Sequence, residues 1–296
     1  MTDARAVHIM TGYDDSPAAR AAIEAGTLLL PTAHAWITHL WTPPIASETL
    51  RHRLWSGRRT LDEFVAAIER EDEWEAGRVA GRGVMLARAS GWDAEPLVHR
   101  TFGGEGLELA RLARSKHADL ILVGSRGLDG TQAILGSVSD MVAHYATTPV
   151  LVVPHPLVQA DYTAIADGPL LIGWDGSTGA AAALAAAGRL FSGRKLLAVS
   201  VGAPGADLPA GLPETVLSRT TRVTVDAGHG MPGHVVADAL AQCARARSAA
   251  AVVVGSRGRS AVAEILLGSA AMATSHRAHR AVVVPGDRTA GSWAST

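Results

Sequence analysis

The 296-residue chain has one cysteine, few aromatic residues and almost no net charge. A single cysteine, Cys243, excludes a disulfide within one chain. A formal net charge of −1 excludes the basic field that nucleic-acid binding requires. The apolar runs are strand-sized, shorter than the roughly 20 residues of a membrane-spanning helix, and no signal-like run follows Met1. We therefore expect a cytoplasmic protein without nucleic-acid or membrane partners.

The composition is that of a globular protein. Hydrophobic residues make up 48% of the chain and charged residues 19%, which is ordinary for a folded domain. The length predicts two domains, each large enough to bury a core of its own.

One stretch occurs twice and organises the chain. Residues 120–127 and 251–258 are both apolar, β-branched runs that end in Gly-Ser-Arg-Gly. A Gly-Ser pair that could open a helix follows each run, at 136–137 and 268–269. A buried strand, a glycine loop and a helix N-terminus together suit phosphate, because backbone N–H groups and the helix end face the anion.

The rest of the chain repeats around this stretch. Each unit begins with an apolar strand that ends in an acidic turn, at Asp14 and at Asp175, followed by a serine suited to cap a helix. The predicted strands are 7–13, 35–41, 95–99, 120–124 and 150–154 in the first unit, with counterparts at 170–174, 195–201, 222–225, 251–255 and 281–285. The predicted first-unit helices are 18–30, 105–115 and 137–145, with a charged, helix-prone stretch over 47–89.

Alternating strands and helices predict an α/β fold. We expect two tandem doubly wound domains, each a five-stranded parallel sheet of order 3-2-1-4-5 with helices on both faces. The predicted boundaries are domain 1 over 1–156, a linker over 157–168, domain 2 over 169–287 and a tail over 288–296. Asp14 and Asp175 are 161 positions apart, but Gly124 and Gly255 only 131, so the second unit is 30 residues shorter between its second and third strands.

The last strand of each unit lies at a sheet edge and is strongly apolar. An apolar edge has to be covered. Pairing 150–153 with 281–284 would cover both edges, as a pseudo-dimer within one chain or a homodimer between two.

These motifs resemble the universal stress protein family. The resemblance lies in Gly-Tyr-Asp-Asp-Ser-Pro at 12–17, Gly-Trp-Asp-Gly-Ser at 173–177 and the family's ATP motif, Gly-x2-Gly-x9-Gly-Ser/Thr. The second unit has this spacing from Gly255 to Ser269, whereas the first has eight residues in place of nine before Gly136. The residue two beyond the motif serine is often a hydroxyl in members that bind ATP; Ser139 fits this and Ala271 does not. The first site is slightly favoured, and single-site occupancy is one outcome.

The resemblance implies an ATP-binding regulatory or sensor module of stress physiology, with Mg²⁺ accompanying the nucleotide. Asp14 and Asp175 would contact the nucleoside, backbone groups near Leu40 and Val201 would line the adenine site, and the motif glycines and serines would take the phosphates. The implied site residues are Asp14, Leu40, Val123, Gly124, Arg126, Gly127, Gly136, Ser137, Val138 and Ser139 in the first unit, and Asp175, Val201, Val254, Gly255, Arg257, Gly258, Gly268 and Ser269 in the second.

Several alternatives stay open. The glycine turns could be purely structural, which would leave an interaction module that docks to a protein partner. Slow ATP hydrolysis is a third reading, although no general base is identifiable and no Gly-x4-Gly-Lys-Ser/Thr motif occurs. Residues 228–233 match Gly-x-Gly-x-x-Gly but lack the later acidic residue, so we interpret them as a turn. The His-Arg run at 276–280 is interpreted as a solvated helix end and not as a metal site.

Overall fold

The computed structural model describes residues 6–42, 61–126, 137–205, 207–228, 232–255 and 281–284. The strands are β1 (His8–Gly12), β2 (His34–Trp41), β3 (Asp93–Arg100), β4 (Leu120–Arg126), β5 (Val150–His155), β6 (Leu170–Gly173), β7 (Leu196–Val201), β8 (Thr220–Val225), β9 (Ala251–Gly255) and β10 (Ala281–Val284). The helices are α1 (Pro17–Leu29), α3 (Leu61–Ala89), α4 (Glu105–Ser115), α5 (Ser137–Tyr145), α6 (Gln159–Asp167), α7 (Thr178–Leu190), α8 (Glu214–Leu217) and α9 (Pro232–Ala246).

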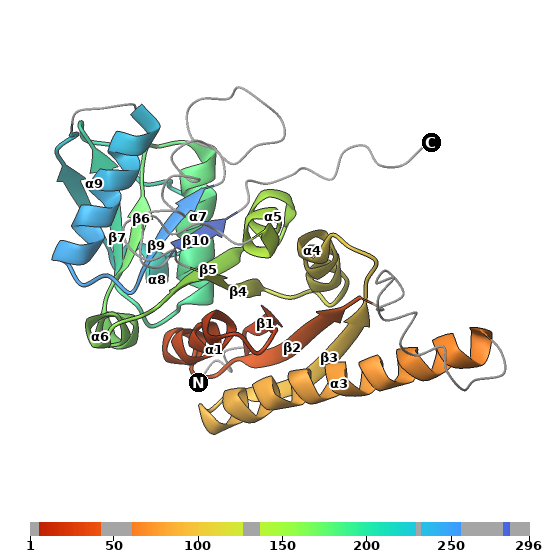
Figure 1. Cartoon of the computed structure of the whole chain (residues 1–296). Coiled ribbons are helices and arrows are strands. Elements are labelled where there is room, and N and C mark those ends of the chain that lie inside the picture. The colour runs from red at the N-terminus through yellow and green to blue at the C-terminus, as the bar shows by residue number, and fades with distance from the viewer. Residues whose placement is uncertain are drawn as a thin grey trace.

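All ten of these strands form one sheet, with the order β3-β2-β1-β4-β5-β10-β9-β6-β7-β8 (Figure 1). Within each half the pairing is parallel and follows the predicted order 3-2-1-4-5. The predicted doubly wound fold is therefore confirmed in both units.

The two halves meet where their edge strands pair. β5 and β10 run antiparallel, with Val152 opposite Ala281 and Val150 opposite Val283. The predicted covering of one apolar edge by the other therefore occurs within the chain. The halves are antiparallel to one another. The carboxyl ends of the strands in one half therefore lie beside the amino ends of the strands in the other half.

Helices cover both faces of the sheet, as expected for a sheet with near-continuous apolar strands. One face carries α1, α3, α6, α7 and α8, and their buried side chains form one apolar cluster that extends through both halves. The other face carries α4 and α5 over the first half and α9 over the second, with one cluster centred on each half; the cluster of the second half also includes Ala143 of α5.

The capping serines begin the first helix of each unit. The Ser16 hydroxyl accepts a hydrogen bond from the Ala19 N–H at 3.2 Å, and the Ser177 hydroxyl accepts one from the Ala180 N–H at 3.1 Å. These bonds satisfy N–H groups that have no partner inside a helix. Both caps agree with the sequence prediction.

The segment expected as a linker, 157–168, contains the helix α6. The Tyr162 hydroxyl of this helix donates a 2.7 Å hydrogen bond to the Glu24 carboxylate of α1. Ile165 is fully buried, so α6 is anchored on the first unit. The connection between the halves is thus a docked helix followed directly by β6.

The units differ most between their second and third strands. The first unit has α3, which is 29 residues long and packs on β2, β3 and α1. The second unit has the short α8 in the corresponding place. The charged stretch predicted from residue 47 is helical from Leu61 onward; residues 43–60 lie outside the described part of the chain, as does the expected tail, 288–296.

Gly124 in β4 and Gly255 at the end of β9 allow a helix to approach the sheet closely. A Cβ atom on Gly124 would overlap the backbone carbonyl of Ala18 at the start of α1. A Cβ atom on Gly255 would lie 2.5 Å from the carbonyl carbon of Gly179 in α7. Neither helix could lie where it does if these positions carried a side chain.

We expect Gly124→Ala and Gly255→Ala each to destabilise the fold by about 1–3 kcal/mol, because backbone atoms cannot move aside as a flexible side chain can. Urea denaturation would measure the loss. Gly193→Ala is the matched control, because a Cβ atom there meets nothing within 4 Å. Equal stability of Gly124→Ala and the control would contradict the packing argument.

Candidate functional site

The acidic turns after β1 and β6 have the same hydrogen bond. Asp14 Oδ1 accepts from the Ser16 N–H at 3.0 Å, and Asp175 Oδ1 accepts from the Ser177 N–H at 2.9 Å. Each carboxylate is therefore held at the carboxyl end of its strand, beside the start of the following helix.

The residue after each of these carboxylates has a left-handed backbone, with φ of 62° at Asp15 and 77° at Gly176. Glycine adopts this conformation without strain, and aspartate is one of the few other residues that tolerate it. Asp15 is held by three partners: the Tyr13 hydroxyl at 2.9 Å, Arg20 at 2.7 Å and Arg82 of α3 at 2.7 Å. The long helix α3 thus braces the acidic turn of the first unit.

These contacts change the pKa values of the turn. Hydrogen bonds from Arg20, and then from Tyr13 and Arg82, lower the pKa of Asp15, partly opposed by its burial. Burial and then the neighbouring Asp15 carboxylate raise the pKa of Tyr13 to about 12, so Tyr13 remains a hydrogen-bond donor at neutral pH.

The aromatic residues that precede the turns are buried against different elements. The Tyr13 ring packs on α3, so closely that a Cβ atom on Gly83 would lie 2.8 Å from it. The Trp174 ring lies against Gly205 in the loop after β7. Each unit therefore anchors its first strand with the segment that follows its second strand.

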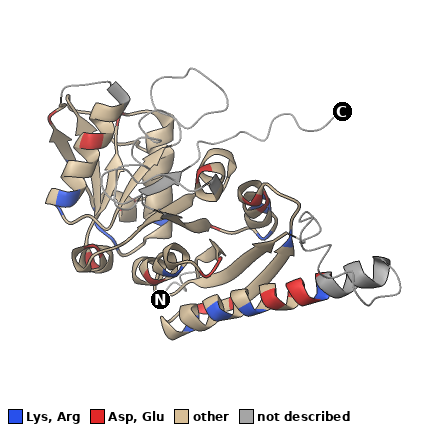
Figure 2. Ribbon diagram, in the orientation of Figure 1, with Lys and Arg blue, Asp and Glu red and all other residues tan. Residues whose placement is uncertain are grey.

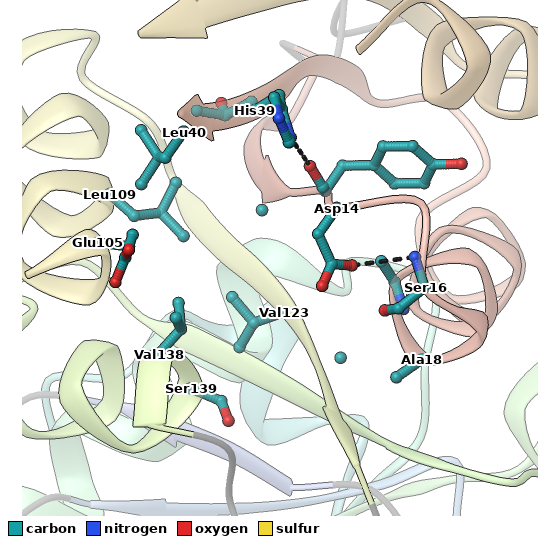
Figure 3. A pocket seen from close by; sticks show the side chains of 15 residues that line it. Asp14, Ser16, Ala18, His39, Leu40, Glu105, Leu109, Val123, Val138 and Ser139 are labelled. Atoms are coloured by element: carbon teal, nitrogen blue, oxygen red, sulfur yellow. Dashed lines mark hydrogen bonds between the residues drawn. The ribbon is translucent and has the colours of Figure 1, made fainter. Parts of the chain in front are cut away.

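A pocket of about 280 Å³ opens at the carboxyl ends of β1, β2 and β4 (Figure 3). The starts of α1, α4 and α5 complete its wall. It lies at the switch point of the sheet, where β1 has β2 on one side and β4 on the other. The lining residues are Gly12, Tyr13, Asp14, Ser16, Ala18, Ala19, Thr38, His39, Leu40, Glu105, Leu109, Val123, Gly124, Val138 and Ser139.

Six sequence-predicted residues meet in this pocket, namely Asp14, Leu40, Val123, Gly124, Val138 and Ser139. They come from the end of β1, the end of β2, the end of β4 and the start of α5. The segments that supply them are as much as 125 positions apart in sequence, and the topology brings them together.

Sequence reasoning missed two wall residues of α4, Glu105 and Leu109, and the β2 residue His39. Glu105 is the first residue of α4, directly after the Gly103-Gly104 turn, and Figure 3 shows its carboxylate on the side of the pocket opposite Asp14. One His39 ring nitrogen lies 2.8 Å from the Tyr13 carbonyl oxygen, which ties the ends of β1 and β2 together. The Gly103-Gly104 pair before α4 is the sequence feature from which Glu105 and Leu109 could have been predicted as lining residues.

Other predicted residues of the first site are described only in part. Gly127 and Gly136 lie outside the described residues. Arg126 ends β4 and Ser137 begins α5, but their side chains are not described.

The second unit arranges its predicted residues in the same topology. Asp175 follows β6, Val201 ends β7, and Val254 and Gly255 end β9, which pairs with β6. Gly173 at the end of β6 lies so close to Val254 that an added Cβ atom would be 3.2 Å from its side chain. Arg257, Gly258, Gly268 and Ser269 lie outside the described residues, as does the run 276–280.

No cluster of three or more His, Cys, Asp or Glu side chains among the described residues could hold a metal ion. None of the helices described is long and apolar enough to cross a membrane.

The fold and the pocket define a tandem doubly wound α/β protein whose candidate site lies at the topological switch point. The model of the universal stress protein family matches residues 7–154 and 219–284. The chain belongs to this family, as the motifs at 12–17 and 173–177 indicated.

Relatives that match over nearly the whole of both chains support the tandem architecture. Universal stress protein Rv2623 of Mycobacterium tuberculosis is 28% identical over 318 aligned positions, which cover 93% of this chain and 95% of the relative. The crystal structure of a universal stress protein from Archaeoglobus fulgidus covers 96% of this chain and 100% of its own, with 17% identity and a TM-score of 0.62, and shows the same fold. A universal stress protein in complex with cAMP matches 50% of this chain at 24% identity, but its TM-score of 0.33 is too low to support an inference here.

The lowered pKa of Asp15 predicts a pH-dependent contribution to stability. A depressed carboxyl pKa stabilises the fold above the unfolded-state pKa, and this stabilisation is lost as the pH falls through the lower folded-state pKa. We expect the wild type to melt at a higher temperature than Asp15→Asn at about pH 6, and the difference to shrink toward about pH 3. Asparagine tolerates the left-handed backbone as aspartate does, so the substitution removes the charge and one acceptor oxygen without adding backbone strain.

The control for this measurement is Asp207→Asn. The Asp207 side chain is 95% exposed and accepts a 2.7 Å hydrogen bond from the exposed Arg222. A wild-type melting curve that responds to acid in the same way as Asp15→Asn would contradict the role of the charged network.

Proposed function

We propose that the first unit binds ATP, accompanied by Mg²⁺, in the pocket between β1 and β4, and that the protein is a regulatory or sensor module of stress physiology. The supporting observation is that the pocket unites Asp14, Leu40, Val123, Gly124, Val138 and Ser139 from distant segments. These are the positions that the family motifs assigned to a nucleotide.

Different residues of the pocket wall suit different parts of a nucleotide. Leu40, Leu109, Val123 and Val138 supply apolar surface of the kind that receives a flat base. The carboxylates of Asp14 and Glu105 favour hydroxyl donors and repel phosphate. We therefore assign the ribose to the Asp14 side.

The phosphates then belong at the start of α5. The N-terminus of a helix carries partial positive charge and unpaired N–H groups, which favour anions. Ser139, in the first turn of α5, is 2% exposed and adds a hydroxyl to this wall. Mg²⁺ would enter bound to the phosphates, as is usual for this ion.

The second crevice is a weaker candidate. It has the same acidic turn, at Asp175, and the same close approach of helix to glycine, at Gly255. It lacks a counterpart of α3, and Ala271 stands where the first unit has Ser139. We propose single-site occupancy, in the first unit.

One observation is compatible with a different function. Gly124 and Gly255 are required for helix packing whether or not a ligand binds. The family glycines are therefore compatible with a module that binds no nucleotide and acts by docking to a partner. Slow ATP hydrolysis is a further proposal, as are the cytoplasmic location and the homodimer.

The test is differential scanning calorimetry of the full chain with ATP·Mg, ADP, AMP and NADH. A ligand at about 100 times its Kd stabilises the folded state by about 2.7 kcal/mol. We expect stabilisation by ATP, and about tenfold weaker binding in Asp14→Asn. This change keeps an oxygen for the Ser16 N–H but removes the charge that strengthens a hydrogen bond from ribose.

Asp175→Asn makes the same change in the second unit and is the matched control. If it weakens ATP binding while Asp14→Asn does not, the assignment to the first unit is wrong. No stabilisation by any nucleotide would favour the docking module, and sustained phosphate release would favour an enzyme. Mass spectrometry of ligand released from the denatured protein would identify any nucleotide already bound.

A further inference from the structure

The charged side chains that line the pocket of the first unit are both acidic. They are Asp14 and Glu105, and no lysine or arginine occurs among the described residues of the wall. Figure 3 shows the two carboxylates on opposite sides of the pocket. Phosphate groups are negatively charged, so a carboxylate beside them repels them unless a cation lies between. A triphosphate that enters this pocket therefore needs a cation with it.

Glu105 lies at the end of the pocket to which the phosphates are assigned. It is the first residue of α4, and α4 begins against the first turn of α5. A Cβ atom on the next residue, Gly106, would lie 2.8 Å from the Val138 carbonyl oxygen and 2.6 Å from the Met141 Cβ atom. Figure 3 shows Glu105 on the same side of the pocket as Val138. The carboxylate is thus beside the helix N-terminus that would receive the phosphates.

The helix dipole alone does not explain this arrangement. An acidic residue in the first turn favours the positive end of a helix, and α4 has two, Glu105 and Glu108. The Glu108 carboxylate is paired, with Arg111 at 2.8 Å and His99 at 2.7 Å. The Glu105 carboxylate has no hydrogen-bond or ion-pair partner among the residues that the structure describes. The dipole favours an acid at this position but does not require an unpaired carboxylate in a pocket wall.

A carboxylate beside phosphate oxygens is a ligand set that suits Mg²⁺. This ion prefers oxygen ligands, keeps several waters, and usually binds through one or two carboxylates together with the phosphates of a substrate. Such a site needs a single protein ligand, so it is compatible with the lack of a three-residue metal cluster among the described side chains. Asp14 does not compete for this role, because it lies across the pocket and its Oδ1 accepts from the Ser16 N–H.

We propose, building on the proposed function, that Glu105 binds the Mg²⁺ that accompanies ATP and makes nucleotide binding depend on the metal. With Mg²⁺ present the carboxylate is a metal ligand, and without it the same carboxylate repels the phosphates. Glu105 therefore selects the metal-bound triphosphate over free ATP. It also disfavours AMP, which lacks the β- and γ-phosphates that Mg²⁺ bridges.

Isothermal titration calorimetry of the full chain with ATP, in excess Mg²⁺ and in excess EDTA, tests the proposal. We expect the wild type to bind ATP about tenfold more tightly with Mg²⁺ than with EDTA. In Glu105→Gln this difference should disappear. The amide neither repels phosphate nor replaces the carboxylate as a metal ligand, so binding weakens in Mg²⁺ and does not weaken in EDTA.

The matched control is Asp140→Asn. Figure 2 shows acidic residues on both α4 and α5, and Asp140 is the acid in the first turn of α5. Its side chain is 46% exposed and does not line the pocket, so the same loss of charge there should preserve the metal dependence.

Two kinds of failure are distinguishable. Equal binding of ATP by the wild type in Mg²⁺ and in EDTA would overturn the role of Glu105 and leave ATP binding intact. Full metal dependence in Glu105→Gln, or its loss in Asp140→Asn, would do the same. Absence of ATP binding under both conditions would refute the proposed function and this inference with it.

Mn²⁺ in place of Mg²⁺ measures the metal directly, by electron paramagnetic resonance of the free ion. The factor by which metal strengthens ATP binding equals the factor by which ATP strengthens metal binding. The ATP complex of Glu105→Gln should therefore bind Mn²⁺ about tenfold more weakly than that of the wild type. If Glu105→Gln folds poorly, Glu105→Asp decides, because it keeps the charge at the start of α4 but withdraws the oxygens by one methylene. It should weaken Mn²⁺ binding, and wild-type affinity for Mn²⁺ in this variant would overturn the proposal.

Discussion

The contact of α1 with Gly124 is the constraint on which the first crevice depends. Because the helix begins directly on the end of β4, the chain between β1 and α1 has room only for a tight turn. That turn is secured by the Asp14 bond to the Ser16 N–H and by the Ser16 cap on α1. The second unit repeats this arrangement at Gly255, although no ligand is needed to explain it. The crevice is thus first a result of helix packing, and its suitability for a nucleotide follows from where that packing leaves carboxylate, hydroxyl and apolar groups.

Local sequence sufficed for much of the fold. Apolar β-branched runs predicted the strands, serines predicted the helix starts, and the cost of an exposed apolar edge predicted the pairing of β5 with β10. It did not indicate α6 within the segment expected as a linker, because this helix is held by a contact between residues 138 positions apart, Tyr162 and Glu24. The wall residues Glu105 and Leu109 were missed for the same reason. Their motif is weak, and only the packing of α4 against the strands brings them to the pocket.

The two units solve one problem in different ways. Each must hold a left-handed residue after its acidic turn. The first uses Asp15, whose carboxylate is bonded by Arg20, Tyr13 and the α3 residue Arg82. The second, with α8 in the place of α3, uses Gly176 and needs no such support. The long helix and the charged network occur together, because Arg82 of α3 is one of the three partners of Asp15.

The apolar cluster beneath α1 and α7 crosses the boundary between the halves without interruption. Two modules joined only by a tether would melt separately, whereas a shared interior and a common sheet make them one cooperative unit. A ligand that binds in one crevice then raises the free energy of unfolding of the whole molecule. A ligand bound at the carboxyl ends of the first-half strands would therefore protect amides of the second half that exchange by global unfolding. No conformational change in the second half is needed for this effect.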